Sequence, residues 1–268
     1  MKGVVNVAAL TDRILAKDFD GGAMETARLG PAAAPDLLPL TSHADPEVRA
    51  LAVECLARTG SPIAARALVR ALPDPEVSVS LAAASGLKVL ATAELAPDLL
   101  VAFDAIPDST ARDEVATLLG TLDGWAPPLL RQRVGREPDA AVRERMIVAL
   151  ARRGEPEARA EFARWLGEAG PRDSPRLVKH ARYIAQPWLL RPLLPLLDDW
   201  TPALHLVEGA PGPPSLRVCD LAVDLVSEIS GQQFAGAPKP LTSYDLAVID
   251  EVKAFLAAIP APPAAPSP

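Results

Sequence analysis

Apolar residues recur at helical spacing along most of the chain, and short polar segments that contain proline separate these stretches. The clearest helix face carries Val48, Leu51, Ala52, Cys55 and Leu56. Asp45 can cap this helix, and Pro46 fits its first turn, where a backbone N–H has no intrahelical acceptor. Gly60 can adopt the left-handed conformation that ends a helix, and Ser61-Pro62 can begin the next one. Residues 45–72 are therefore predicted to form a helical hairpin with apolar inner faces.

The same order of signals recurs along the chain. Further hairpins are predicted to open at Asp74-Pro75, Asp108-Ser109, Glu137-Pro138, Asp173-Ser174 and Ser215-Leu216. Second helices are predicted to begin near Ala96-Pro97, Ala126-Pro127, Glu155-Pro156 and Pro187. Residues 26–40 have the pattern of a degenerate hairpin that lacks its opening residues. Because proline is accepted in the first helical turn and disfavoured inside a helix, most of the 29 prolines mark helix starts.

Two prolines depart from this rule. Pro192 and Pro195 fall inside the second helix predicted after Pro187. An interior proline removes a backbone hydrogen bond and clashes with the preceding turn, so we expect a kinked, partly unwound helix here. The alternative is that this deviation serves a specific partner.

The composition agrees with a helical fold. The 49 Ala and 38 Leu make up about a third of the 268 residues, against only 11 aromatic residues. Val, Ile, Thr and aromatic residues are scattered instead of alternating, which disfavours a β-sandwich or barrel. A hydrophobic content of 49% and a net charge of only −7 exclude disorder of the whole chain.

Cysteine usage and hydropathy indicate the compartment. Cys55 and Cys219 lie far apart with no Cys-x-x-Cys motif, which is typical of buried, reduced cysteines. Residues 1–12 are too weakly apolar for a signal peptide, and no apolar run reaches the length of a membrane span. We therefore expect a cytoplasmic protein that does not bind membranes.

Two sequence segments carry a family resemblance: Asp-Pro-Glu-Val-Arg-Ala-Leu-Ala at 45–52 and Pro-Asp-Ala-Ala-Val-Arg at 138–143. On these residues the chain resembles the HEAT-repeat family, in its short bacterial form related to phycobilisome-lyase-type repeats, over roughly residues 24–259. The resemblance implies that the opening Asp and the Arg after Val belong to a ladder that ties neighbouring repeats together. Arg49 and Arg143 match this Arg position, whereas Ser78 departs from it and Arg112 agrees only loosely.

The predicted fold class is all-α, a right-handed α-solenoid of about six to seven stacked helical hairpins. The expected divisions are an N-terminal helical cap (1–23), HEAT-like repeats (24–198), a Pro/Gly-rich loop (199–214), a C-terminal repeat with a capping helix (215–259) and a Pro/Ala-rich flexible tail (260–268).

Charge is distributed unevenly. Residues 131–182 carry 13 basic and 8 acidic side chains, whereas residues 1–130 and 193–268 are acidic. The overall balance of 34 acidic against 27 basic residues argues against a protein that binds nucleic-acid phosphates.

The resemblance also implies that the second helix of each hairpin lines an extended concave surface. Candidate protein-binding residues on these helices are Arg66, Arg70, Trp125, Arg131, Arg133, Arg159, Arg164, Trp188 and Arg191. Arg and Trp are enriched at interface hot spots, so these residues suggest a groove, centred on residues 125–191, for an acidic or amphipathic partner. The alternative is that the tryptophans pack between hairpins and the arginines pair with glutamates such as Glu155 and Glu168 on a solvated face.

Catalytic and cofactor signals are sparse. His43, His180 and His205 lie in different repeats without metal-ligand spacing, and the common hydrolase, P-loop and dinucleotide motifs do not occur. Cys219 beside Asp220 would need a neighbouring base to act as a nucleophile, and a core cysteine is the simpler interpretation. We predict no catalytic residue, no metal and no cofactor.

These patterns favour a non-enzymatic scaffold, adaptor or regulator that binds another protein through its concave face. An immunity-type inhibitor of a basic effector is one alternative, because the acidic ends would steer association with such a target. A HEAT-like enzyme, such as an alkylpurine DNA glycosylase or a chromophore lyase, is the other. The basic central belt allows a DNA-repair enzyme, but the net negative charge argues against it.

Overall fold

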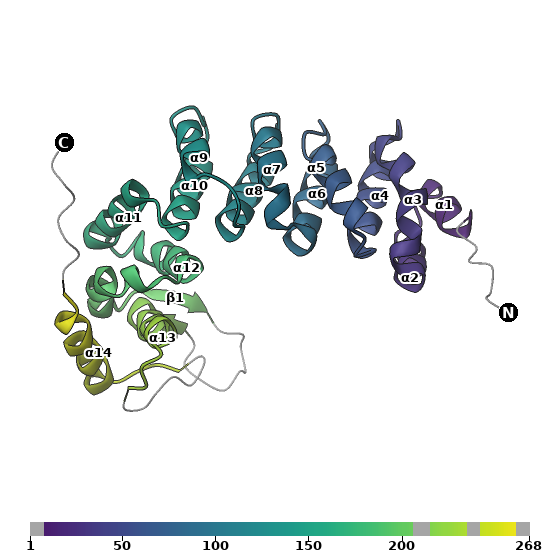
Figure 1. Cartoon of the computed structure of the whole chain (residues 1–268). Coiled ribbons are helices and arrows are strands. Elements are labelled where there is room, and N and C mark those ends of the chain that lie inside the picture. The colour runs from purple at the N-terminus through teal and green to yellow at the C-terminus, as the bar shows by residue number, and fades with distance from the viewer. Residues whose placement is uncertain (1–7, 206–214, 235–241, 261–268) are drawn as a thin grey trace. The chain divides into compact units, whose positions relative to one another are not determined.

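The computed structural model describes residues 8–205, 215–234 and 242–260. Nearly all regular structure in these residues is helical, which confirms the predicted all-α class (Figure 1). The chain divides into two compact units, residues 1–153 and 154–268, which we name the N-terminal unit and the C-terminal unit. Most of the predicted Pro/Gly-rich loop (206–214), the tail from residue 261 and the first seven residues of the predicted cap lie outside the described residues. No helix in the described ranges is both long and apolar enough to cross a membrane.

The N-terminal unit is built from helices alone within its described residues. Its α-helices are α1 (Ala8–Leu15), α2 (Phe19–Leu29), α3 (Ala34–Leu37), α4 (Pro46–Arg58), α5 (Pro62–Ala71), α6 (Val77–Leu90), α7 (Ala96–Phe103), α8 (Ser109–Thr121), α9 (Pro127–Val134) and α10 (Ala140–Arg152). Its 3₁₀ helices are η1 (Gly30–Ala33), η2 (Leu38–Ser42) and η3 (Ala93–Leu95).

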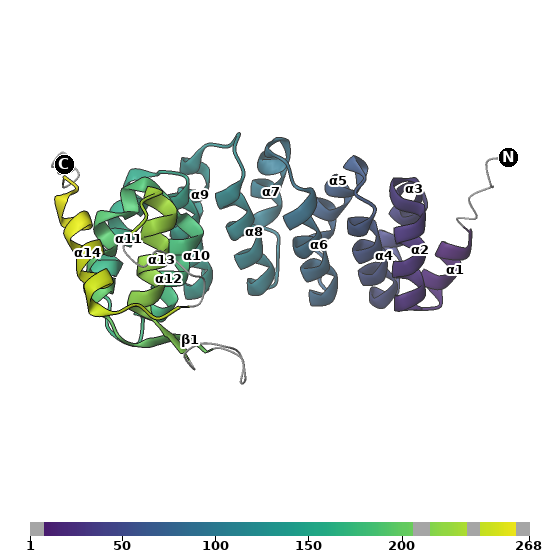
Figure 2. The same cartoon turned by 90° about the horizontal axis from the view of Figure 1, so that it is seen from below.

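These helices stack as hairpins. The first helices α4, α6, α8 and α10 each pack on the next, and the second helices α5, α7 and α9 follow one another in a second row (Figures 1 and 2). Ala52 of α4, Ala83 of α6 and Ala116 of α8 are fully buried, so each first helix has a small side chain in the core. The N-terminal unit is therefore a solenoid of stacked helical hairpins, as predicted.

The predicted helix starts are largely correct. The Asp45 carboxylate accepts the backbone N–H of Glu47, and Asp108 and Asp139 cap α8 and α10 in the same way. Gly60 has a φ of 65°, the left-handed conformation that the hairpin requires.

The hairpin that the sequence predicts at residues 26–40 does have an opening residue, Asp18, although the sequence pattern indicated none. The Asp18 carboxylate accepts the N–H of Gly21 at 3.0 Å, so the first helix of this hairpin is α2, which begins at Phe19. The return segment alternates between 3₁₀ and α-helix, because Pro31, Pro35 and Pro39 interrupt backbone hydrogen bonding every four residues. The sequence pattern appeared incomplete because Asp18 lacks a following proline.

An arginine ladder ties neighbouring hairpins together. Arg49 donates two hydrogen bonds to the Asp74 carboxylate, from Nε at 2.8 Å and from Nη2 at 2.9 Å, and its Nη1 donates to the carbonyls of His43 and Ala44. The side chains of Arg49 and Asp74 are only 15% and 12% exposed, and bidentate charge-assisted bonds in such surroundings are strong. The acceptor lies 25 residues after the arginine, just before the next first helix, so each bond fixes the spacing of two hairpins.

Arg112 belongs fully to this ladder, which corrects the expectation that it agrees only loosely. It donates to both Glu137 oxygens, again 25 residues later, and its Nη1 donates to the carbonyls of Ile106 and Pro107. Like Arg49, it stands four residues after the N-cap of its helix. The sequence motif hid this match because no proline follows Asp108.

Between Arg49 and Arg112 in the ladder, α6 has no equivalent arginine. The equivalent position is Ser80, whereas the sequence motif pointed to Ser78. The N-cap of α6 is Glu76, so the fourth position falls on Ser80, whose hydroxyl donates to the carbonyl of Leu72 at 2.6 Å. The matching acceptor position before α8 is Ile106, which is buried. The arginine and its acidic acceptor are therefore both absent at this step.

Gly86 in α6 lies close against the preceding hairpin. A Cβ added to Gly86 would lie 2.5 Å from the Cβ of Ala57 in α4 and 2.9 Å from Cδ1 of Leu68 in α5. Only a residue without a side chain lets α6 pack this closely against the preceding hairpin.

The C-terminal unit departs from regular hairpins. Its helices are α11 (Pro156–Glu168), α12 (Ser174–Ile184), α13 (Val218–Ser230) and α14 (Leu246–Ala258), with 3₁₀ helices η4 (Pro187–Leu189) and η5 (Arg191–Asp198). Because η5 contains Pro192 and Pro195, the second helix after α12 is a 3₁₀ helix, which confirms the predicted unwinding. Phe162 is fully buried and makes edge contacts with Trp165 and Trp188.

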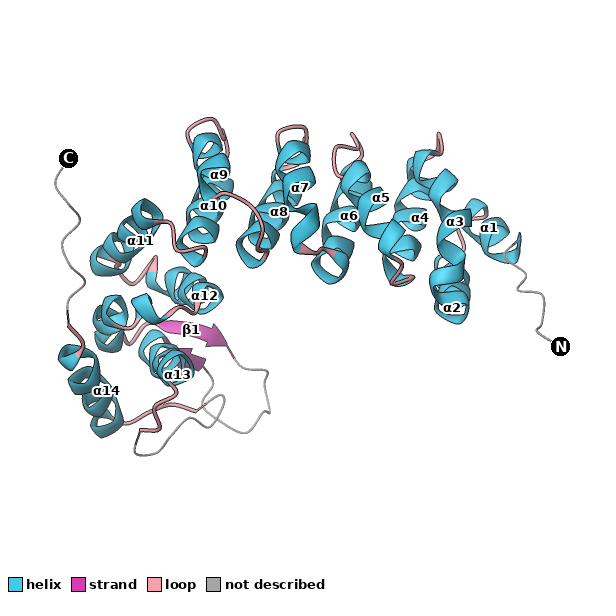
Figure 3. Ribbon diagram, in the orientation of Figure 1, coloured by secondary structure: helices cyan, strands magenta, loops and turns pink. Residues whose placement is uncertain are grey.

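A short antiparallel ribbon occupies part of the predicted loop. Strand β1 (Pro202–His205) pairs with β2 (Ser215–Arg217) (Figure 3). In this pairing Leu204 lies opposite Leu216. The prediction of a loop for residues 202–205 is therefore wrong. Proline is accepted as the first residue of an edge strand, and burial of Leu216 stabilises the ribbon.

A buried carboxylate connects α13 to the start of α14. Asp220 is fully buried, and it accepts two hydrogen bonds from the Arg217 guanidinium, one from the Arg217 backbone N–H and one from the backbone N–H of Tyr244. Burial acts to raise the pKa of Asp220, but these hydrogen bonds outweigh it and lower that pKa. The Tyr244 hydroxyl donates to Asp224 at 2.7 Å, and burial raises the pKa of Asp224.

We expect Asp74→Asn to lower the free energy of unfolding at pH 7 by about 1–3 kcal/mol, because the ladder loses a charge-assisted pair. Burial opposes ionisation of Asp74, but the bonds from Arg49 and from the N–H of Glu76 hold its pKa below the usual value. A depressed folded-state pKa stabilises the fold above the unfolded pKa of about 4, and this contribution disappears as pH falls through the folded pKa. Urea unfolding should show that the difference in unfolding free energy between variant and wild type shrinks as the pH falls from 7 to 3.

Asp104→Asn, which removes the acid of an exposed ion pair, is the control for this prediction. An equal loss of stability in both variants would contradict the ladder.

We expect Gly86→Ala to lower the free energy of unfolding by about 1–2 kcal/mol, because the clash with Ala57 and Leu68 exceeds the gain in helix propensity. Gly135→Ala is the matched control, since a Cβ there meets nothing within 4 Å and its φ is −70°. Thermal unfolding of both variants checks this, and a stabilised Gly86→Ala variant would show that the α4–α6 contact is looser than described.

Candidate protein-binding face

The second helices of the N-terminal unit expose a stripe of side chains, which we call the second-helix face. In α5, the alanines together with Leu68 and Val69 are buried in the core, whereas Ile63, Arg66 and Arg70 are exposed. The face comprises Ile63, Arg66 and Arg70 from α5, Val101 from α7, and Leu129, Gln132 and Arg136 from α9 and the turn after it. Ile63, Val101 and Leu129 are 45%, 75% and 44% exposed, so each of the three helices presents one aliphatic side chain.

Charged groups on the first-helix row pair with one another. Besides the ladder, Lys88 of α6 binds Glu114 of α8 at 2.5 Å, and Arg145 of α10 binds Asp113 of α8 at 3.1 Å. Each of these pairs joins two successive first helices. These ion pairs leave the row with few charged groups for a ligand.

The second-helix face differs in this respect. Arg66 and Arg70 are exposed and make no ion pair with any residue that the structure describes. They stand one turn apart on α5, so both guanidinium groups are available on the same side. Asp98 of α7 is also exposed, so the second helices together are not uniformly basic.

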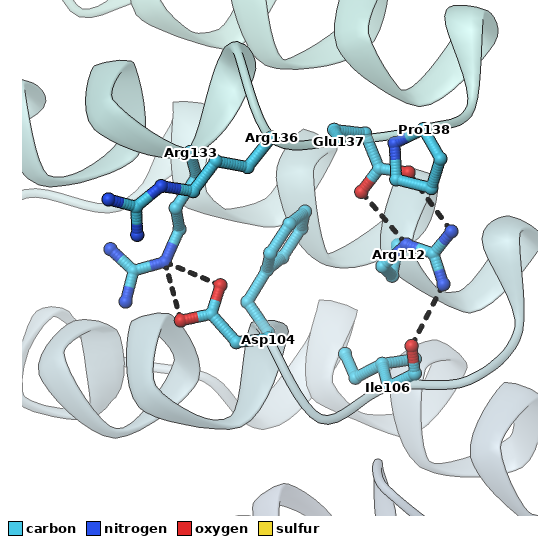
Figure 4. A pocket seen from close by; sticks show the side chains of 8 residues that line it. Asp104, Ile106, Arg112, Arg133, Arg136, Glu137 and Pro138 are labelled. Carbon is cyan, nitrogen blue, oxygen red and sulfur yellow. Dashed lines mark hydrogen bonds and ion pairs between the residues drawn. The ribbon is translucent and has the colours of Figure 1, made fainter.

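A pocket of about 520 Å³ opens between the ends of α7 and α9 (Figure 4). It is lined by Phe103, Asp104, Ile106, Arg112, Arg133, Arg136, Glu137 and Pro138. Arg133 donates from Nε to both oxygens of Asp104, at 2.9 and 3.1 Å. The ladder pair Arg112–Glu137 closes the opposite side of the pocket, as Figure 4 shows.

The other candidates in the N-terminal unit divide by burial. Arg133 lines the pocket, and Arg131 is half-buried on the same helix. Trp125 is buried, with its indole N–H donating to the carbonyls of Leu119 and Leu122 at 2.9 and 3.0 Å. This geometry favours the alternative that Trp125 packs between helices.

The candidates in the C-terminal unit all have contacts within that unit. The Arg159 guanidinium lies over the Trp188 ring at 5.1 Å, Arg164 pairs with Glu168 at 3.2 Å, and Arg191 donates to the carbonyl of Ile259. The Arg164 pair is the i,i+4 surface pair that the alternative interpretation describes. The predicted groove centred on residues 125–191 would combine residues of both units, whereas the second-helix face lies in the N-terminal unit alone.

The two cysteines, which are the candidate nucleophiles of the sequence, are both buried. Burial raises the pKa of the Cys219 thiol to about 11, so this cysteine stays protonated at neutral pH and fits the core interpretation. Cys55 is also buried and free. Within the described residues, no three His, Cys, Asp or Glu side chains are close enough together to hold a metal ion.

Sequence reasoning missed Arg136, Asp104 and the pocket they line. A signal was present, because ion-paired residues in successive hairpins are about one repeat apart. Asp104 and Arg133 are separated by 29 residues, and Asp113 and Arg145 by 32. A search for opposite charges at this spacing would have found these pairs.

Three comparisons with known proteins show what the chain is similar to. Residues 23–88 match the family described as HEAT repeats. A solved structure, the complex of CpcE and CpcF of phycocyanin lyase from Nostoc sp. PCC7120, is similar at 24% identity, covering 54% of this chain and 99% of that chain, with a TM-score of 0.43. A comparison with curated proteins found no significant match. The similarity to HEAT repeats in sequence therefore covers residues 23–88.

Proposed function

We propose that this protein is a non-enzymatic scaffold or adaptor that binds another protein through the second-helix face of its N-terminal unit. The observation that carries this proposal is the difference between the two helix rows. Charges on the first helices are paired across hairpins, whereas α5 presents Arg66 and Arg70 without ion pairs in the described residues. Stacked helical repeats commonly use one row of helices as an extended binding surface.

The aliphatic side chains support the same face. Ile63, Val101 and Leu129 come from three successive second helices, and each leaves nearly half or more of its surface exposed. A partner that covers them removes apolar area from water, which favours association. Arginine beside such residues is a common composition of interface hot spots.

The charges also indicate the partner's chemistry. A partner segment that carries acidic residues beside apolar ones would match Arg66, Arg70 and the aliphatic row. Arginine forks bind carboxylates with two parallel hydrogen bonds, so this match gives orientation as well as attraction. The net charge of −7 makes a protein surface a better ligand than a nucleic acid.

We expect the double variant Arg66→Glu/Arg70→Glu to lose its partner. The full-length chain, tagged and expressed in its own host, would be purified with its bound proteins, which quantitative mass spectrometry would measure. Reversing two charges on the face should reduce enrichment of the partner at least tenfold, because acidic groups would then repel.

The matched control is Arg172→Glu/Lys179→Glu, which changes charge equally at exposed positions of the C-terminal unit. This variant should retain the partner. Equal loss in both double variants would indicate a nonspecific charge effect, and unchanged enrichment in Arg66→Glu/Arg70→Glu would exclude the second-helix face.

A further inference from the structure

The pocket between the ends of α7 and α9 contains one more cation than its internal ion pairs use. Its charged lining residues are Asp104, Glu137, Arg112, Arg133 and Arg136. Arg112 pairs with Glu137, and Arg133 pairs with Asp104. Arg136 is exposed and has no ion pair among the residues that the structure describes, so a single positive charge remains.

Arg112 is fully engaged by the fold. Its Nε and Nη2 bind Glu137, and its Nη1 binds the carbonyls of Ile106 and Pro107. Its side chain is 14% exposed and that of Glu137 is 4% exposed. This pair forms a rigid wall of the pocket and cannot turn toward a ligand without breaking the ladder.

Arg133 and Arg136 supply the donors that remain. Arg133 uses Nε for Asp104 and Nη1 for the carbonyl of Leu129, and its Nη2 has no acceptor in the described part of the chain. In Figure 4 both guanidinium groups extend toward the same side of the pocket. Asp104 and the Leu129 carbonyl hold Arg133 in place before any ligand arrives, which reduces the entropy lost on binding.

We propose that this pocket binds one Asp or Glu carboxylate of a protein partner, held between Arg136 and the Nη2 of Arg133. This inference rests on the proposed function and assigns a specific contact to one end of the second-helix face. The volume of about 520 Å³ suits one or two side chains. Phe103, Ile106 and Pro138 provide apolar lining against which the methylene groups of a glutamate can pack.

Asp104, which lines the pocket, favours a ligand with a single negative charge. The Asp104 side chain is 60% exposed and lies at the same site, so it repels anions, and a dianion more than a monoanion. The charged side chains that line the pocket have a net charge of +1, which one carboxylate would neutralise. A phosphate would bring more negative charge than Arg136 compensates, and we therefore favour an acidic side chain over a phosphate group.

The test uses the full-length protein and a hexaglutamate peptide with blocked ends, followed through the arginine Nε–Hε signals in NMR spectra. We expect saturable shifts at Arg133 and Arg136, and no shift with hexaglutamine. Arg136→Gln should weaken hexaglutamate binding at Arg133 about tenfold, since one charge-assisted contact is lost. Arg70→Gln, at another exposed arginine of the face, should leave the Arg133 shift unchanged.

Three results would overturn the inference: no saturable shift at Arg133 and Arg136, an Arg136→Gln variant that binds as wild type does, or equal weakening by Arg70→Gln. A parallel titration with inorganic phosphate that gave tighter binding at the same two arginines would also overturn the choice of a carboxylate. Any of these results leaves the second-helix face itself open to partner binding, because that is tested separately at Arg66 and Arg70.

Discussion

The structure of the N-terminal unit depends on how each first helix is joined to the next. An arginine four residues after the N-cap reaches the acid that precedes the following first helix, 25 residues away, and its third nitrogen binds two carbonyls of the loop before its own helix. One side chain therefore fixes a loop, a helix start and the next hairpin together. Where this arginine is absent, as at Ser80, a buried isoleucine replaces the acid as well. A buried acid without its arginine would be costly, so the two positions change together.

Because the ladder joins first helices to one another, the charged side chains of the first and second helices have different roles. The first helices use their charged groups on one another and pack closely at small residues such as Gly86. The second helices contribute alanine and leucine to the core and leave arginine and aliphatic side chains exposed. Arg66 and Arg70 of the second row are therefore not part of the ion pairs that join the hairpins. Substitutions at exposed positions of this kind usually change stability little.

The C-terminal unit is stabilised differently. Prolines exclude a regular second helix after α12, and aromatic contacts around Phe162 fill the core instead. The buried carboxylate of Asp220 then takes the place of a hairpin ladder, since Arg217 and the N–H of Tyr244 both donate to it. The Arg217 guanidinium also lies 4.2 Å from the centroid of the Trp200 ring. Most arginines of this unit that the sequence suggests as ligands serve as such internal contacts.

The sequence by itself determined most helix starts in the N-terminal unit, because caps, prolines and apolar spacing act within a few residues. It located Asp45, Asp108 and Gly60 correctly, and it anticipated the unwinding at Pro192 and Pro195. It could not decide which charged groups remain available to a partner. Arg112, Arg133 and Arg66 look alike as exposed helix residues in the sequence, yet the first two find acids 25 and 29 residues away. Only the tertiary structure brings those acids within hydrogen-bond distance, since the stacking geometry of neighbouring hairpins sets which side chains can meet.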